Sequence, residues 1–188
     1  MSEAMQTDNP WRSRGRAVVF GDDIKHDAMI VPARIIGARI ADPKVLVTHL
    51  FEELRPELRG SVRPGDFIVG GRNFGCGKPH VVGYIAMREL GLRLMCESMP
   101  LKIIRATMNL ALPVLSACPG LGAHVGDGDD IEADFATGEI INHTRGTRLV
   151  VPPLSERVRE VIANGGLRGM LERHLAANPE MAQPYPQA

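Results

Sequence analysis

A glycine-rich segment between an apolar run and a helical pattern sets the strongest constraint on how this chain can fold. Phe67-Ile68-Val69 follows the turn signal Arg63-Pro64-Gly65-Asp66 and predicts a buried strand. Four glycines fall within the next eight residues, 70–77, and a helical pattern runs from Pro79 to Leu90. A proline suits the first turn of a helix because its missing N–H has no partner there anyway. We therefore expect a strand, a tight loop and a helix in that order.

The same alternation of strands and helices runs through most of the chain. Expected strands are 17–20, 67–69, 92–96 and 113–116, and expected helices are 44–54, 79–90 and 101–110. The last third changes to an antiparallel meander over 131–135, 140–141 and 148–151, followed by helices 156–163 and 167–175. This order predicts an α/β fold with a mixed sheet and a small antiparallel β extension. Residues 1–14 are expected to form a disordered lead, 15–176 the domain, and 177–188 a flexible tail.

Charge and cysteine usage exclude several classes of function. Lys plus Arg equals Asp plus Glu at 22 each, so nothing in the charge balance favours nucleic acid or an acidic membrane surface. No apolar run reaches the ~20 residues of a membrane span. Cys76, Cys96 and Cys118 are scattered and odd in number, which favours a reducing, cytoplasmic location. Their spacing also argues against a metal site or an iron–sulfur cluster held by this chain itself.

The glycine-rich loop has two interpretations. Its backbone N–H groups, at the start of a helix, are suited to bind a carboxylate or phosphate. Alternatively, the glycines serve only a tight turn that needs positive φ. Cys76 within the loop is either a nucleophile with a lowered thiol pKa or a small packed side chain. A second polar loop, Gly21-Asp22-Asp23-Ile24-Lys25-His26-Asp27, follows the first strand and is either a metal or orienting site or a solvated loop.

Several segments, in order and spacing, resemble one family: the small subunit of isopropylmalate isomerase, which is similar to the mobile fourth domain of aconitase. The resemblance extends over about residues 16–175. Its longest match is the run from Pro64 to Gly77. The other matching segments are Gly21-Asp22-Asp23-Ile24, Asp27-Ala28, Glu97-Ser98, Arg105, Asn109, Leu112-Pro113-Val114-Leu115, Gly128-Asp129, Thr137-Gly138-Glu139-Ile140 and Gly165-Gly166-Leu167. The resemblance implies an aconitase-type swivelling β/β/α domain.

The resemblance also implies a mechanism and a partner. A [4Fe–4S] cluster with one open iron would be bound by an aconitase-like large subunit, not by this chain, and would act as a Lewis acid on a hydroxy acid. The small subunit would close over it and supply the group that takes a proton, together with residues that bind carboxylates. The expected reaction is loss or addition of water, and Asp27 would orient a partner histidine.

One departure from the family lies in the catalytic part of the loop. The family continues with Gly-Ser-Ser-Arg-Glu, whereas this chain has Gly77-Lys78-Pro79-His80-Val81. Pro79 has neither a side-chain oxygen nor an N–H, so it cannot replace the serine base. His80 is a candidate base, because imidazole titrates near neutral pH, and Lys78 is a candidate cation for a carboxylate. The alternative is that this loop reflects lost activity.

A second departure lies in the segment that corresponds to the family's substrate loop, which here reads Val31-Pro32-Ala33-Arg34-Ile35-Ile36-Gly37-Ala38-Arg39. Arg34 and Arg39 are therefore both candidates for carboxylate recognition. The expected site therefore comprises His80 and Lys78 as catalytic residues, with Asp27, Arg34, Arg39, Cys76 and Gly77 binding substrate. Three hypotheses remain open: a hydro-lyase small subunit for an unusual hydroxy acid, an ordinary leucine-pathway isomerase subunit, and a non-catalytic regulatory or assembly module.

Overall fold

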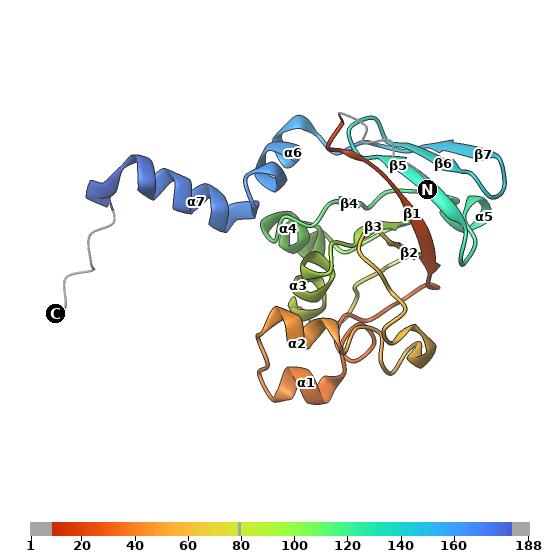
Figure 1. Cartoon of the computed structure of the whole chain (residues 1–188), viewed down its shortest axis with the longest axis horizontal. Helices are drawn as coiled ribbons and strands as arrows, with labels where there is room; N and C mark the ends of the chain where they lie inside the picture. The colour runs from red at the N-terminus through yellow and green to blue at the C-terminus, as the bar shows by residue number, and fades with distance from the viewer. Residues whose placement is uncertain (1–8, 79, 182–188) are drawn as a thin grey trace, which may run out of the picture.

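The computed structural model describes residues 9–78 and 80–181, which are organised around a mixed β-sheet (Figure 1). Seven strands of this described part follow the order β4-β3-β2-β1-β5-β6-β7. β1 to β4 are parallel and β5 to β7 are antiparallel to their neighbours. The strands are β1 Arg12–Val19, β2 Phe67–Gly70, β3 Arg93–Cys96, β4 Val114–Leu115, β5 Asp130–Asp134, β6 Glu139–Asn142 and β7 Thr147–Val150. The expected α/β fold with an antiparallel extension is confirmed.

Strand β1 joins the two halves of the sheet. Its residues 12–16 pair antiparallel with β5, and its residues 17–19 pair parallel with β2. The strand therefore begins inside the stretch that we expected to be a disordered lead. Arg12 and Arg14 form ion pairs with Glu132 and Asp130 of β5, so charge pairing rather than an apolar pattern supports this end of the strand. Residues 1–8 and 182–188 of the expected lead and tail lie outside the described part.

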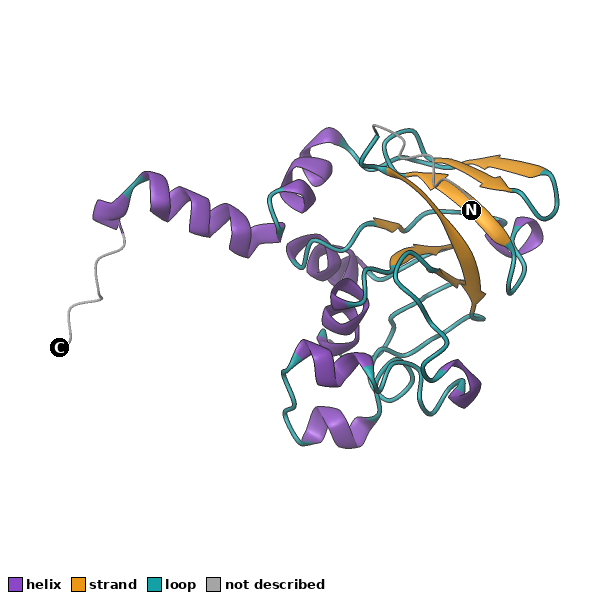
Figure 2. Cartoon of the chain, in the orientation of Figure 1, coloured by secondary structure: helices purple, strands orange, loops and turns teal. Residues whose placement is uncertain are grey.

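Helices cover the parallel half of the sheet and extend from it (Figure 2). They are α1 Ala33–Gly37, α2 Pro43–Val47, η1 Pro56–Leu58, α3 Val82–Glu89, α4 Leu101–Asn109, α5 Leu121–His124, α6 Glu156–Ala163, α7 Gly166–Ala177 and η2 Pro179–Met181. α1 and α5 were not expected. α7 runs to Ala177, the first residue of the expected tail.

Two expected helices differ from the structure by more than two residues at one end. The predicted helix 44–54 is wrong beyond Val47: the N–H of Phe51 donates to the Ile30 carbonyl oxygen at 2.8 Å, and Phe51 has φ +58°. This tertiary contact turns the chain out of the helix. The helix expected from Pro79 begins at Val82 instead, and Pro79 itself lies outside the described part.

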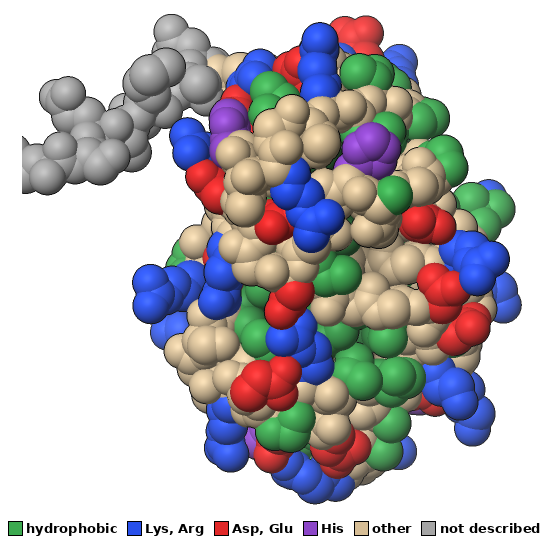
Figure 3. Space-filling view, turned by 90° about the vertical axis from the view of Figure 1, so that its right-hand side faces the viewer, with side chains coloured by type: hydrophobic (Ala, Val, Ile, Leu, Met, Phe, Trp, Pro, Cys, Tyr) green, Lys and Arg blue, Asp and Glu red, His purple; other side chains and the backbone are tan. Residues whose placement is uncertain are grey.

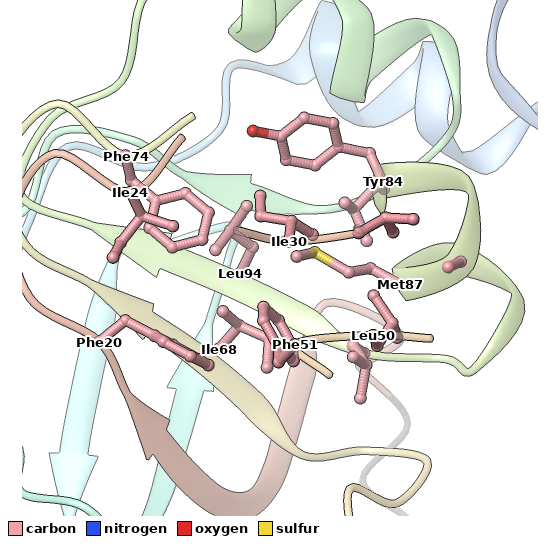
Figure 4. Packing of buried hydrophobic residues seen from close by; sticks show 14 of the residues in the cluster. Phe20, Ile24, Ile30, Leu50, Phe51, Ile68, Phe74, Tyr84, Met87 and Leu94 are labelled. Atoms are coloured by element: carbon pink, nitrogen blue, oxygen red, sulfur yellow. The ribbon is translucent and has the colours of Figure 1, made fainter. Parts of the chain in front are cut away.

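Two hydrophobic clusters lie on opposite faces of the parallel strands. Ile68 of β2 points to the cluster under α3 and α4, whereas Phe67 and Val69 point to the cluster shared with β5 and β6. All three side chains are buried because a central parallel strand is covered on both faces. Figure 4 shows Ile24 and Phe74, which come from two different loops, at one end of the first cluster. The loops that carry the candidate site are therefore fixed to the core.

Charged side chains of both signs are mixed on the surface. Figure 3 shows Lys and Arg interspersed with Asp and Glu over the face that it displays. Within residues 9–78 and 80–181, no helix has the length and apolar character needed to cross a membrane. The location of the protein in the cytoplasm remains a prediction.

Candidate active site

The candidate site forms where two loops follow neighbouring parallel strands. The loop after β1, residues 20–31, and the loop after β2, residues 71–81, leave the sheet at the same edge, and backbone pairing continues beyond the strands. Phe20 donates its N–H to the Val69 carbonyl oxygen at 2.7 Å, and an isolated bridge pairs Lys25 with Cys76. The two loops are thus held together by main-chain hydrogen bonds.

The N–H groups of the glycine-rich loop are used in holding it in place. Six consecutive groups, from Gly71 to Cys76, donate to acceptors within the protein. These acceptors are the carbonyl oxygens of Gly21, Ile24 (twice) and Ser98, the Asp22 carboxylate and the Ser98 hydroxyl, at 2.7–3.2 Å. The expectation that this part of the loop binds an anion through its N–H groups is therefore wrong. The alternative, a tight turn, is what the structure supports for these residues.

Gly77 ends this anchored stretch and lies against Asp27. Its φ of +96° is in the left-handed region, and a Cβ there would overlap the Asp27 Oδ1 atom. Asp27 Oδ1 is buried and has no hydrogen-bond partner among the described residues. Both requirements favour glycine at this position. Asp27 and Gly77 are thus brought together, as the expected site requires.

Cys76 is packed into the pairing of the two loops. Its N–H donates to Ile24 O, its carbonyl oxygen accepts from the His26 N–H at 3.2 Å, and its thiol lies 3.4 Å from Asp23 O. The backbone and the thiol of Cys76 are both engaged between the two loops, so this geometry favours the packed cysteine over the nucleophile. Any contact of Cys76 with a substrate would have to come from its sulfur.

His26 lies beneath the turn that follows Cys76. Its side chain is 0% exposed, and its ring Nδ1 accepts a hydrogen bond from the His80 N–H at 3.2 Å. The rings of His26 and His80 have centroids 6.4 Å apart, and the His26–Tyr84 separation is also 6.4 Å. Burial lowers the pKa of His26, partly opposed by the Asp27 carboxylate. The sequence placed His26 in a polar loop that was either a metal or orienting site or a solvated loop, but it gave no signal that the histidine would be buried.

Lys78 and His80 are exposed on either side of Pro79, and their side chains face solvent. Neither Lys78 nor His80 forms an ion pair within residues 9–78 and 80–181. By contrast, Arg72 on the same loop is paired with Asp22 at 2.7 Å. Lys78 is therefore a cation of this loop whose charge is not compensated by a described carboxylate.

The two candidate arginines lie on and after α1. Arg34 donates to both oxygens of Glu52, at 2.7 and 2.8 Å, and Glu52 also contacts His49 Nδ1 at 2.6 Å. These contacts, first that of His49, lower the pKa of Glu52. Arg39 is exposed, with φ +55°. Binding a substrate carboxylate through Arg34 would require displacing Glu52, whereas Arg39 has no such described partner to displace.

The described residues do not fit the ligand set of an iron–sulfur cluster. Within 9–78 and 80–181, no three His, Cys, Asp or Glu side chains gather in a way that would bind a metal ion. Cys96 and Cys118 are completely buried, and burial raises both thiol pKa values, that of Cys118 to about 12. Cluster ligands are thiolates, so these two neutral thiols are unsuited to the role.

Comparison with known proteins identifies close relatives. No protein-family model matches the sequence. The 3-isopropylmalate dehydratase small subunit of Thermodesulfovibrio yellowstonii is 35% identical over 164 residues, which are 87% of this chain and 95% of the relative. The methanogen homoaconitase small subunit of Methanothermobacter thermautotrophicus is 35% identical over 155 residues, 82% of this chain and 87% of the relative. A crystal structure of 3-isopropylmalate dehydratase from Methanocaldococcus jannaschii superposes with a TM-score of 0.80 and 27% identity, covering 91% of this chain and 99% of that chain.

Replacing Gly77 by alanine should destabilise the protein. The new Cβ would force Asp27 Oδ1 to move and would put alanine at φ +96°, so we expect the free energy of unfolding to fall by about 1–3 kcal/mol. Chemical denaturation measures this change. Gly37→Ala is the matched control, because a Cβ at Gly37 meets nothing within 4 Å and that residue has no positive φ. Equal stability of the two variants would contradict the packing described for Gly77.

The buried His26 should make stability depend on pH. Burial lowers its pKa below the usual 6.5, so as the pH falls the unfolded chain binds a proton before the folded chain does. The free energy of unfolding should therefore decrease as the pH falls below about 6.5 and should level off below the folded-state pKa. Denaturation curves between pH 8 and pH 5, compared for the wild type and His26→Asn, measure the effect. Parallel curves for the two proteins would show that His26 does not titrate in this way.

Proposed function

Because the chain belongs to the family of 3-isopropylmalate dehydratase small subunits, we propose that it acts on a small hydroxy acid other than isopropylmalate, with Lys78 and His80 as its reacting residues. It is the small subunit of a two-subunit hydro-lyase and requires a large-subunit partner. The observation that carries the proposal is the exposure of Lys78 and His80 at the end of a loop whose preceding six N–H groups are all anchored. Such anchoring gives the segment that carries the two residues a fixed starting point.

The large subunit would provide the iron–sulfur cluster that an aconitase-like family implies. The described residues of this chain do not offer a thiolate set, so we assign the cluster to the partner. When bound, the cluster supplies a Lewis acid that assists departure of the substrate hydroxyl. Asp27, whose carboxylate lies beside Gly77 at the end of the anchored loop, would orient a histidine of that subunit.

The share of the reaction that belongs to this chain is proton transfer and substrate binding. The His80 imidazole would take the proton from the carbon next to a carboxylate. The electron pair of that C–H bond becomes the second bond of the alkene as the C–O bond of the neighbouring carbon breaks. The departing hydroxide takes up a proton to become water, the His80 imidazolium releases its proton to solvent, and the net products are an enoate and water. The Lys78 ammonium would bind a substrate carboxylate as a point charge, without the two-pronged geometry of arginine. Arg39 is a second cation for the same purpose, whereas Arg34 would first have to leave Glu52.

Isopropylmalate itself is the second candidate substrate, favoured by the names of several relatives. The replacement of Ser-Ser-Arg-Glu by Lys78-Pro79-His80-Val81 disfavours it, because both the serine base and the arginine clamp are absent. We expect that this chain, expressed with its large subunit, will not restore growth of a leucine auxotroph that lacks its own isomerase. Growth on medium without leucine would assign the protein to the leucine pathway.

Removal of the His80 side chain tests the proposed base. In the complex with the large subunit, His80→Ala should lower kcat at least about 100-fold, because the group that takes the proton is lost. His80 is exposed, so the free energy of unfolding should change by less than about 0.5 kcal/mol and the subunits should still assemble. His143→Ala, which removes another exposed imidazole between β6 and β7, is the control and should keep normal turnover. Normal turnover in His80→Ala would rule out His80 as the base and would favour the non-catalytic alternative for this loop.

A further inference from the structure

His26 forms hydrogen bonds with Cys76, which precedes Lys78, and with His80, which follows it. Its backbone N–H donates to the Cys76 carbonyl oxygen at 3.2 Å, and its ring Nδ1 accepts the His80 N–H, also at 3.2 Å. The His80 N–H is shared with the Lys78 carbonyl oxygen, at 2.8 Å. The His26 side chain therefore connects the residue that bears the proposed base to the buried loop after β1.

This contact begins where the other anchors of the loop end. The six N–H groups from Gly71 to Cys76 fix the loop as far as Cys76, and α3 starts only at Val82. Between these points the exposed residues Lys78 and His80 have little packing to hold them. The ring of His26 is 0% exposed, and a rigid buried acceptor of this kind restricts the position of the backbone that it binds.

We propose that His26 is a positioning residue that holds the backbone of His80 where its imidazole can take the substrate proton. This inference rests on the proposed function of His80 and extends it to a residue that does not contact the substrate. Its role requires one tautomer: Nδ1 accepts, so the ring proton is on Nε2, which is buried without a described partner.

The surroundings of His26 favour the neutral ring that this role needs. A proton on Nδ1 would face the N–H of His80 and abolish the contact. Burial is the largest influence and lowers the pKa of His26. The Asp27 carboxylate and the backbone hydrogen bonds of His80 and Gly77 oppose this effect, and the charge of the His80 imidazole adds to it. The ring centroid of Tyr84 lies 6.4 Å from that of His26. The Tyr84 phenol is uncharged because burial raises its pKa. At neutral pH the acceptor is therefore maintained.

Replacing His26 by asparagine or by leucine, two residues of similar size, distinguishes the effect of the hydrogen bond from the effect of filling the space. In His26→Asn the side-chain oxygen can occupy the place of Nδ1 and accept the His80 N–H, whereas His26→Leu fills the site without an acceptor. In the complex with the large subunit, we expect His26→Leu to lower kcat about 10- to 100-fold and His26→Asn to restore most of it. His26→Leu should cause no further loss when added to His80→Ala, since the misplaced group is already absent.

A second readout does not depend on turnover. Hydrogen exchange of the His80 backbone amide in the full-length chain should be slow in the wild type and in His26→Asn, and faster in His26→Leu. Wild-type kcat in His26→Leu, or equal loss in the leucine and asparagine variants, would overturn the inference. If His80→Ala retains full turnover, the proposed function is wrong. The anchoring role of His26 is then tested by hydrogen exchange alone. If the His80 amide exchanges at the same rate in His26→Leu and in the wild type, that role is wrong as well.

Discussion

The pairing of the two loops that follow β1 and β2 is the interaction on which the site depends. Gly75 and Cys76 both donate to the Ile24 carbonyl oxygen, Gly71 donates to Gly21, and Asp23 donates to Arg72. These bonds continue the parallel pairing of β1 with β2 beyond the last strand residues. The loops approach this closely only where side chains are absent: a Cβ at Gly71 would overlap Asp22, and one at Gly77 would overlap Asp27. These glycines thus allow close contact between protein segments.

A consequence of this pairing is a division of roles along one short segment. Residues up to Cys76 use their main-chain donors internally and so form a rigid support. Lys78 and His80 follow directly and are exposed. The neighbouring cation Arg72 is paired with Asp22, and Arg34 on α1 is paired with Glu52. Among the described residues, Lys78 is therefore the cation of this loop that has no carboxylate partner, and it lies close to His80 in the sequence. This arrangement suits a substrate in which a carboxylate, bound by Lys78, is next to the carbon that gives its proton to His80.

The sequence predicted those parts of the fold that local patterns determine. The strand at 67–69 is an apolar run that follows a turn. The helix 156–163 was predicted with its observed bounds, and its N-cap residue Ser155 accepts a hydrogen bond from the Val158 N–H. Longer-range contacts set the features that were missed. Arg12 and Arg14 extend β1 only because β5 places carboxylates opposite them, and Phe51 ends α2 early by bonding to Ile30. The same limit applies to the site. Several N–H groups of the glycine-rich loop donate to acceptors in Gly21–Ile24, which lie about 50 residues earlier in the sequence. His26 and His80, which are hydrogen-bonded, are separated by a similar number of residues.

The most direct test of the account is turnover by the assembled enzyme. The chain would be purified anaerobically together with its large subunit, its iron–sulfur content verified, and formation of an enoate followed over a panel of hydroxy acids that includes isopropylmalate. The account predicts a brown complex that dehydrates one acid of the panel other than isopropylmalate. A complex with an intact cluster that forms no enoate from any of them would contradict it, and would indicate that the Lys78-Pro79-His80 segment marks the loss of the family's base rather than its replacement.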